Sequence, residues 1–123
     1  MDVLEARGVI AAMLAEKLGL TPGRTFFIGA IPPGVRDAAA FSLDGIRAWR
    51  PDGATECEAA VRGVSEDEAG LIARLGTLRG LLLCDRASGV LSWQLRDPVA
   101  LRVLPDAAGD LYAFEMPLLV SFV

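Results

Sequence analysis

The chain contains no histidine among its 123 residues. Histidine is the commonest general base and metal ligand at neutral pH, and its absence excludes every Ser–His or Cys–His nucleophile pair. The only lysine, Lys17, falls at the solvated end of an expected helix and is a poor candidate for Schiff-base chemistry. No GxGxxG, GxxxxGKS or GxxxxGKT phosphate loop occurs. We therefore expect no enzyme, no cofactor and no bound metal.

Cysteine and long apolar runs are also scarce. Cys57 and Cys84 are too few for a disulfide scaffold and lack metal-ligand spacing, so we expect both to be reduced and buried. The runs without polar side chains, such as 8–15 and 81–84, are shorter than the ~20 residues of a membrane-spanning helix. Acids stand near the N-terminus where a secretory signal carries positive charge. These features predict a cytoplasmic chain that contacts no membrane.

A basic surface is missing as well. Twelve basic and sixteen acidic residues give a net charge of −4, and the two signs are interleaved along the sequence. Nucleic-acid affinity depends on clustered Lys and Arg, so sequence-specific nucleic-acid binding is not expected. In contrast, 53% of the residues are apolar. Since monomers rarely expose large apolar patches, we expect copies of the chain to cover part of its surface, although an Ala- and Leu-rich composition without special meaning is the alternative.

Apolar residues at three- and four-residue spacing predict two helices. The first covers 2–18, with Asp2 at its start and Gly19 as its stop. The second opens at Ser65, which with Glu68 forms a capping box, and a turn is expected at 85–89. The apolar faces are expected to comprise Val3, Leu4, Ile10, Met13, Leu14 and Leu18 in the first helix, and Leu71, Ile72, Leu75, Leu78, Leu82 and Leu83 in the second.

Period-two alternation and β-forming residues predict six strands. They are expected at 25–31, at 39–44 with an end at Asp44-Gly45, at 56–62, at 90–95, at 99–103 and at 111–123. The order is α-β-β-β-α-β-β-β, and every step between strands is compatible with antiparallel pairing. Residues 1–123 are thus expected to form one α+β domain, a mainly antiparallel sheet with two helices packed on it.

Three groups of residues are candidates for function. Trp49 lies between Arg47 and Arg50 in a stretch, 46–53, that is longer than a tight hairpin needs. These residue types dominate binding hot spots, so we interpret them as a protein contact, with stacking on a base as the alternative. Glu56 and Glu58 share one strand face and could hold a cation, or face arginines across the sheet. Two further acids flank a loop that only weakly resembles a metal-binding loop, Asp106 and Asp110.

The order of several short elements resembles a known family. An N-terminal helix precedes the stretch 27–33, which ends in Ile31-Pro32-Pro33, and then 41–45, which reads Phe-Ser-Leu-Asp-Gly. The stretch 58–63 ends in Val-Arg-Gly and runs into the second helix, and 106–110, Asp-Ala-Ala-Gly-Asp, precedes the last strand. In this order, over nearly the whole chain, they resemble the small minor capsid or tail-terminator proteins of tailed bacteriophages. The sequence departs from that pattern at Asp110, where a basic residue more often follows the glycine.

The resemblance implies a structural virion protein without catalytic residues. Such proteins form a ring, usually of six subunits, which caps the tail tube and joins it to the head–tail connector. The implied partners are copies of the chain, the tail-tube protein and a connector or stopper protein. The implied location is the neck of a virion that is assembled in the bacterial cytoplasm. The contacts would come from 46–53 and from the loops 32–37 and 105–110, with Arg47, Trp49, Arg50, Arg36 and Asp110 as interface candidates.

Three alternatives stay open. The chain could be another head–tail joining protein, such as a head-closure or stopper protein. It could be a small-ligand-binding domain with a pocket under Phe26, Phe27 and Trp93, although these aromatics also suit a core. An enzyme that works with the carboxylates of Glu56 and Glu58 alone is the remaining hypothesis.

Overall fold

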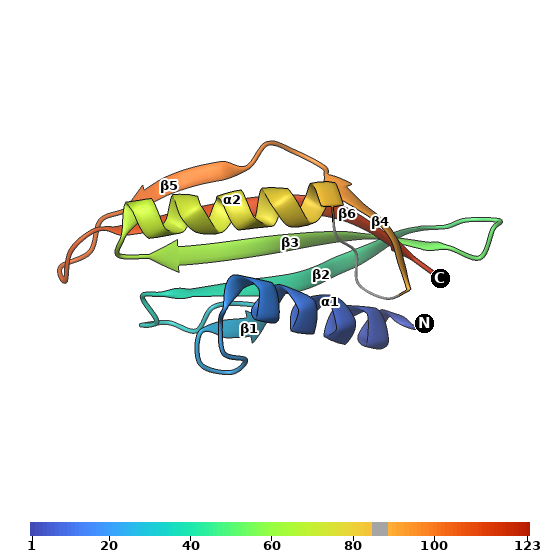
Figure 1. The fold of residues 1–123 in the computed structure, drawn as a ribbon, viewed down its shortest axis with the longest axis horizontal. Helices are drawn as coiled ribbons and strands as arrows, with labels where there is room; N and C mark the ends of the chain where they lie inside the picture. The colour runs from blue at the N-terminus through green and yellow to red at the C-terminus, as the bar shows by residue number, and fades with distance from the viewer. Residues whose placement is uncertain (85–88) are drawn as a thin grey trace.

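The computed structural model describes residues 1–84 and 89–123, and its elements follow the expected order α-β-β-β-α-β-β-β (Figure 1). The α+β class is therefore confirmed. The turn predicted at 85–89, apart from Gly89, lies outside the described residues, as does the side chain of Cys84. The elements are α1 (Val3–Leu18), β1 (Phe26–Ile28), β2 (Ala38–Trp49), β3 (Thr55–Ser65), α2 (Glu68–Cys84), β4 (Val90–Leu95), β5 (Ala100–Leu104) and β6 (Leu111–Phe122).

The strands form one sheet in the order β1-β2-β3-β6-β4, and β5 also pairs with β6. One edge of β6 pairs with β3 along its whole length, whereas β5 and β4 share the other edge, end to end. The expectation that all steps are compatible with antiparallel pairing is wrong at two places. β1 is parallel to β2, and β4 and β5 do not pair with each other but follow one another along β6 in the same direction. Residues 29–37 lead the chain back across the sheet before β2 starts, so no hairpin joins β1 and β2.

Both helices pack on the same face of the sheet (Figure 1), where alternate residues of β2, β3 and β6 form the core. Phe41, Val61 and Met116 lie on this face and are at most 3% exposed. Gly63 lies opposite Phe114, and the Phe114 ring occupies the space that a Cβ of residue 63 would need. A glycine is therefore required at this point of β3, because any larger residue would meet an aromatic ring.

The ends of α1 follow the sequence signals, and the start of α2 departs from them. Asp2 Oδ1 accepts from the Glu5 N–H at 2.8 Å, and Gly19 ends α1 in the left-handed region at φ 67°. The predicted capping box is wrong, because Ser65 still belongs to β3 and its Oγ accepts from the Asp67 N–H at 3.0 Å. The carbonyl of Asp67 accepts the helical bond from Leu71, so α2 begins at Glu68, two residues later than a cap at Ser65 implies.

Parts of the predicted apolar faces are exposed. The side chains of Leu4 on α1 and Ile72 on α2 face solvent, with exposed fractions of 67% and 49%. Small residues close the α1 contact instead, since Ala6, Ala11 and Ala15 are buried against the sheet. Spacing alone counted large side chains and overlooked the alanines that let α1 approach the strands closely.

β2 does not end at Asp44-Gly45, as predicted, but continues to Trp49. The pairing with β3 shifts between Leu43 and Gly45 and again between Ile46 and Ala48, so the glycine marks a β-bulge rather than a turn. The hairpin turn spans 50–54, where the Arg50 N–H donates to the Ala54 carbonyl and Gly53 has φ 86°. The stretch 46–53 is thus the end of a long hairpin and not a separate excursion.

The two ends of the chain meet at the end of the sheet that carries this hairpin and β4 (Figure 1). The N-terminal ammonium of Met1 donates to the carbonyl of Val123 at 2.9 Å. The connections that contain 32–37 and 105–110 lie at the opposite end of the sheet (Figure 1). In the described part of the chain, no helix combines the length and apolar character that crossing a membrane requires.

Candidate protein-interaction site

The hairpin tip, residues 46–54, brings three predicted interface residues together. Trp49 has an exposed fraction of 76%, the largest among the exposed large apolar residues, and Ile46 is 45% exposed. Arg47 Nε lies 3.7 Å from Glu56 Oε1, and Arg50 Nη1 lies 4.0 Å from Glu56 Oε2. Arg50 Nε also lies 3.9 Å from Asp52 Oδ1. The tip therefore presents an exposed aromatic side chain and two loosely held arginines, which suits contact with a protein surface.

The pair Glu56 and Glu58 is divided between different arginines. Glu56 faces the hairpin arginines, whereas Glu58 Oε1 lies 3.9 Å from Arg96 Nη1. This agrees with the interpretation of a strand face opposite arginines. Within residues 1–84 and 89–123, no group of three or more His, Cys, Asp or Glu side chains could hold a metal ion.

Arg36 lies at the other end of the sheet and is engaged inside the chain. Its Nε donates to Glu66 Oε1 at 2.6 Å, its Nη1 to Asp106 Oδ2 at 2.8 Å and its Nη2 to the Gly109 carbonyl at 2.8 Å. We name these four residues the Arg36 clip. It ties the loop 32–37 to the start of α2 and to the loop 105–110, which leaves Arg36 little freedom to bind a neighbouring subunit.

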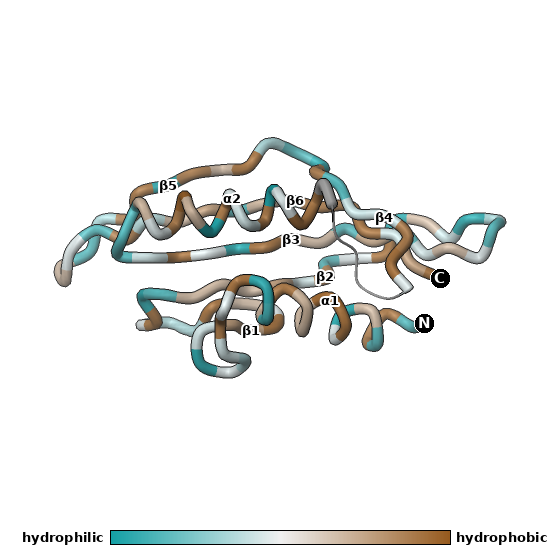
Figure 2. Tube along the Cα trace, viewed as in Figure 1, coloured by the Kyte–Doolittle hydropathy of each residue, from teal (hydrophilic) through white to brown (hydrophobic). Residues whose placement is uncertain are grey.

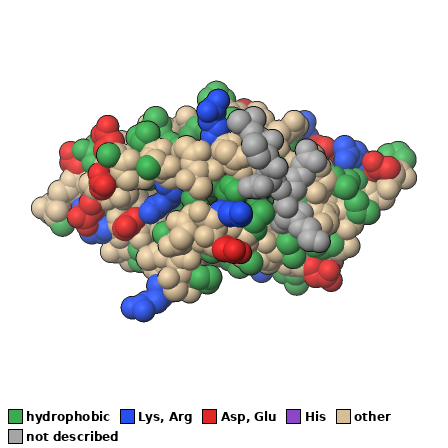
Figure 3. Space-filling model, in the orientation of Figure 1, with side chains coloured by type: hydrophobic (Ala, Val, Ile, Leu, Met, Phe, Trp, Pro, Cys, Tyr) green, Lys and Arg blue, Asp and Glu red, His purple; other side chains and the backbone are tan. Residues whose placement is uncertain are grey.

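The clip also sets the ionisation of its acid. The N–H of Ala108 and the guanidinium of Arg36 hold the pKa of Asp106 below its usual range. Asp110, the interface candidate in this loop, is exposed and makes no ion pair with the rest of the described chain. Acidic side chains gather at this end of the molecule (Figure 3), so the clip lies in an acidic, polar surface.

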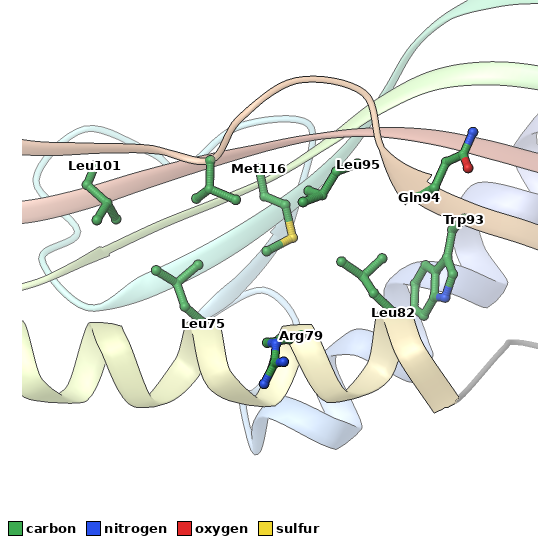
Figure 4. A pocket seen from close by; sticks show the side chains of 9 residues that line it. Leu75, Arg79, Leu82, Trp93, Gln94, Leu95, Leu101 and Met116 are labelled. Carbon is green, nitrogen blue, oxygen red and sulfur yellow. The ribbon is translucent and has the colours of Figure 1, made fainter.

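A second apolar feature, the α2–β4 groove, was not predicted from the sequence. It has a volume of about 560 Å³ and lies between α2 and the strands β4 and β5. Figure 4 shows Leu75 and Leu82 pointing from α2 toward the strands, with Met116 and Leu95 opposite. The groove is lined by Leu75, Arg79, Leu82, Trp93, Gln94, Leu95, Val99, Leu101 and Met116.

The groove exists because β5 lies at the sheet edge beyond the cover of α2. Leu101 and Val103 lie on the helix-covered face of the sheet, yet they are 58% and 54% exposed. Their alternation with Arg102 predicted a strand, and Figure 2 shows the apolar trace of β5 along this edge. The alternation predicted the strand correctly. Its burial, however, depends on how much of the width of the sheet α2 covers, and a local sequence pattern does not contain this information.

The pocket expected under Phe26, Phe27 and Trp93 is not formed as one cavity. Phe26 and Phe27 line a hollow beside α1, whereas Trp93 lines the α2–β4 groove. Phe26 and Trp93 are buried, with exposed fractions of 2% and 6%, and belong to the core. Cys57 is also buried, as expected, and burial raises the pKa of its thiol.

The comparisons with known proteins do not extend this picture. The chain matches no protein-family model, and no curated protein is similar to it in sequence. The candidate site is therefore defined by geometry alone, with an exposed hairpin tip at one place and an exposed apolar groove at another.

Proposed function

We propose that the chain is a structural virion protein, a tail terminator of a tailed bacteriophage. Its copies form a ring, of six subunits in the family that it resembles, which caps the tail tube and joins it to the head–tail connector. The family assignment rests on the order of the short sequence elements described above. The assembly itself rests on the molecular surface.

The observation that carries the proposal is the pair of apolar features that the subunit leaves exposed. The hairpin tip carries Trp49 and Ile46, and the α2–β4 groove is lined almost wholly by apolar side chains. The two features differ in shape and lie on different elements. A ring needs such an interface, in which one patch meets a different patch and rotation closes the circle.

The test is the size of the protein in solution. Light scattering at several concentrations, with and without the tail-tube protein, should reveal an assembly of defined subunit number, and electron microscopy should show rings. A strict monomer under both conditions would contradict the proposal. Head-closure and stopper proteins would also assemble, and binding to the tail-tube protein in preference to the connector separates the terminator from them.

The groove also gives the small-ligand hypothesis a definite place. A volume of about 560 Å³ with mainly apolar lining is typical of a small-molecule site. Under this alternative, a metabolite library should raise the melting temperature of a protein that shows no self-association. Stabilisation that disappears when Leu82 is replaced by Arg would locate the ligand in the groove.

A further inference from the structure

The sheet leaves two stretches of strand edge unpaired within the described part of the chain. β1 covers β2 only from Ala39 to Phe41, so the segment 43–49 has no partner on that side. β4 pairs with β6 on one side and with no described strand on the other. Open edges of this kind present rows of backbone donors and acceptors that can pair with another chain.

The two open edges lie at the same level of the sheet. The register of β4 with β6, of β6 with β3 and of β3 with β2 connects them step by step. Leu43 is level with Leu95 through Ala59 and Leu118. Ile46 is level with Trp93 through Cys57 and Val120. Trp49 is level with Val90 through Thr55 and Phe122. At the other level of the sheet, β1 and β5 occupy the corresponding edges.

The directions of the two edges also match. Three antiparallel steps separate β2 from β4, so β4 runs opposite to β2. A second copy that is displaced sideways across the sheet therefore brings its 43–49 segment antiparallel to β4 of the first copy. Antiparallel pairing allows perpendicular, closely spaced backbone hydrogen bonds, and no strand has to reverse.

The side chains of the two edges agree in their faces. Residues directly opposite each other in an antiparallel pair share a face, so Ile46 and Trp49 lie on the helix-covered face through their partners Cys57 and Thr55. Trp93 and Leu95 lie on the same face of β4 and line the α2–β4 groove. Pairing of the edges would carry Leu43 and Ile46 of one copy to the level of Leu95 and Trp93 in the groove of the next. Trp49 would lie beside the groove, at the level of Val90.

We propose that successive copies join edge to edge, with β2 residues 43–49 of one subunit pairing with β4 of its neighbour and covering the α2–β4 groove. The inference rests on the proposed function, because it names the contact by which the ring forms. The contact is heterologous, so it repeats around the ring and uses both exposed apolar features of every subunit.

The charges and bulges of the edges are compatible with this contact. β4 carries no charged residue, so Arg47 and Asp44 meet no like charge on it. The two irregularities in β2 increase local twist and bend the strand. Bulges often protect an edge from pairing, but they also provide the curvature that a closed sheet needs.

Engineered cysteines test the contact directly. At the expected register Ala48 is level with Ser92, and both lie on the face away from the helices. In a Cys84→Ser background, in which Cys57 is buried, we expect oxidised A48C/S92C to give a ladder of disulfide-linked oligomers that stops at the ring size. Each single variant alone should stay unlinked. A48C/Q94C tests a stagger of two residues, which keeps the same face.

The outcomes separate this contact from the proposed function. Rings that form without cross-links in either double variant would overturn the edge-to-edge contact and leave the ring function standing. A48C that links to itself would replace it with a two-fold contact. A protein that stays monomeric with and without the tail-tube protein would overturn both proposals.

A matched pair of charge substitutions gives a second measurement. Ile46→Lys places a charge in the proposed seam, whereas Ile28→Lys changes an equally exposed isoleucine, 50% against 45%, at the end of β1. We expect Ile46→Lys to raise the concentration of half-assembly about tenfold or more, and Ile28→Lys to leave it unchanged. Equal effects of the two substitutions would contradict the proposed seam.

Discussion

The two ends of the sheet both carry arginines near carboxylates, but the contacts differ in length and in the role that they allow. At one end, Arg36 forms three contacts of 2.6–2.8 Å within the chain. At the other end, the arginines of the hairpin tip reach their carboxylates only at 3.7–4.0 Å, and a tryptophan beside them faces solvent. An arginine whose donors are used internally holds loops together, whereas one that is loosely held remains available to another molecule.

The largest effect should come from the buried tryptophan at the hairpin end. Trp93 is 6% exposed, and Trp93→Ala should lower the free energy of unfolding by ~3–5 kcal/mol, because it leaves a cavity between β4 and α2. Urea denaturation measures the change, with Gln94→Ala on the exposed side of β4 as the control. A decrease in the free energy of unfolding below ~1 kcal/mol would mean that the packing of Trp93 contributes little to the stability of the subunit.

The exposed tryptophan should behave in the opposite way. Trp49→Ala should weaken assembly by ~2 kcal/mol or more and change the free energy of unfolding by less than ~0.5 kcal/mol, because the ring touches little in the subunit. Light scattering during dilution and urea denaturation measure the two quantities. Leu104→Ala, an exposed residue at the clip end, is the control. Normal assembly of Trp49→Ala would remove the hairpin tip from the interface.

Loss of the clip should act on the loops and not on assembly. Arg36→Ala removes all three contacts to Glu66, Asp106 and Gly109, so hydrogen exchange of amides in 32–37 and 105–110 should accelerate. The concentration of half-assembly should stay as in the parent protein. Arg24→Ala, an exposed arginine without an ion pair in the described chain, is the control. Weaker assembly of Arg36→Ala alone would assign the clip to the interface after all.

The smallest effect concerns acid stability. Since the folded pKa of Asp106 is lowered, its contribution is fully present above the ordinary pKa of about 4 and is lost as the pH falls through the folded value. Asp106→Asn should therefore flatten the decline of stability as the pH falls below about 4. Urea denaturation at a series of pH values measures the decline in the parent protein and in Asp106→Asn, and equal declines would contradict the prediction.

Local signals predicted much of the fold. The first helix with its stop at Gly19 and the strand expected at 56–62 were confirmed, because each depends on neighbours along the chain. The predicted start of α2 and the predicted antiparallel step from β1 to β2 were wrong. Both depend on how far a neighbouring strand extends or where a connection returns, and adjacent residues do not encode these distances.

The candidate site was also predicted only in part, because some of its residues are neighbours in the sequence and others meet only in the folded chain. Arg47, Trp49 and Arg50 stand together in the sequence and remain together in space. Arg36 and Asp110 were assigned to the surface as separate residues, but the partner of Arg36 in that loop is Asp106. The α2–β4 groove combines residues of α2, β4, β5 and β6, so only the folded chain brings it together.

The contact between Met1 and Val123 has a practical consequence for anyone who labels or extends this molecule. A purification tag, fluorescent protein or linker at either end projects from the molecular surface beside β4 and the hairpin. At this place it can hinder the approach of another copy. The loop 105–110 lies at the far end of the sheet, so a small insertion there keeps a probe away from both apolar features.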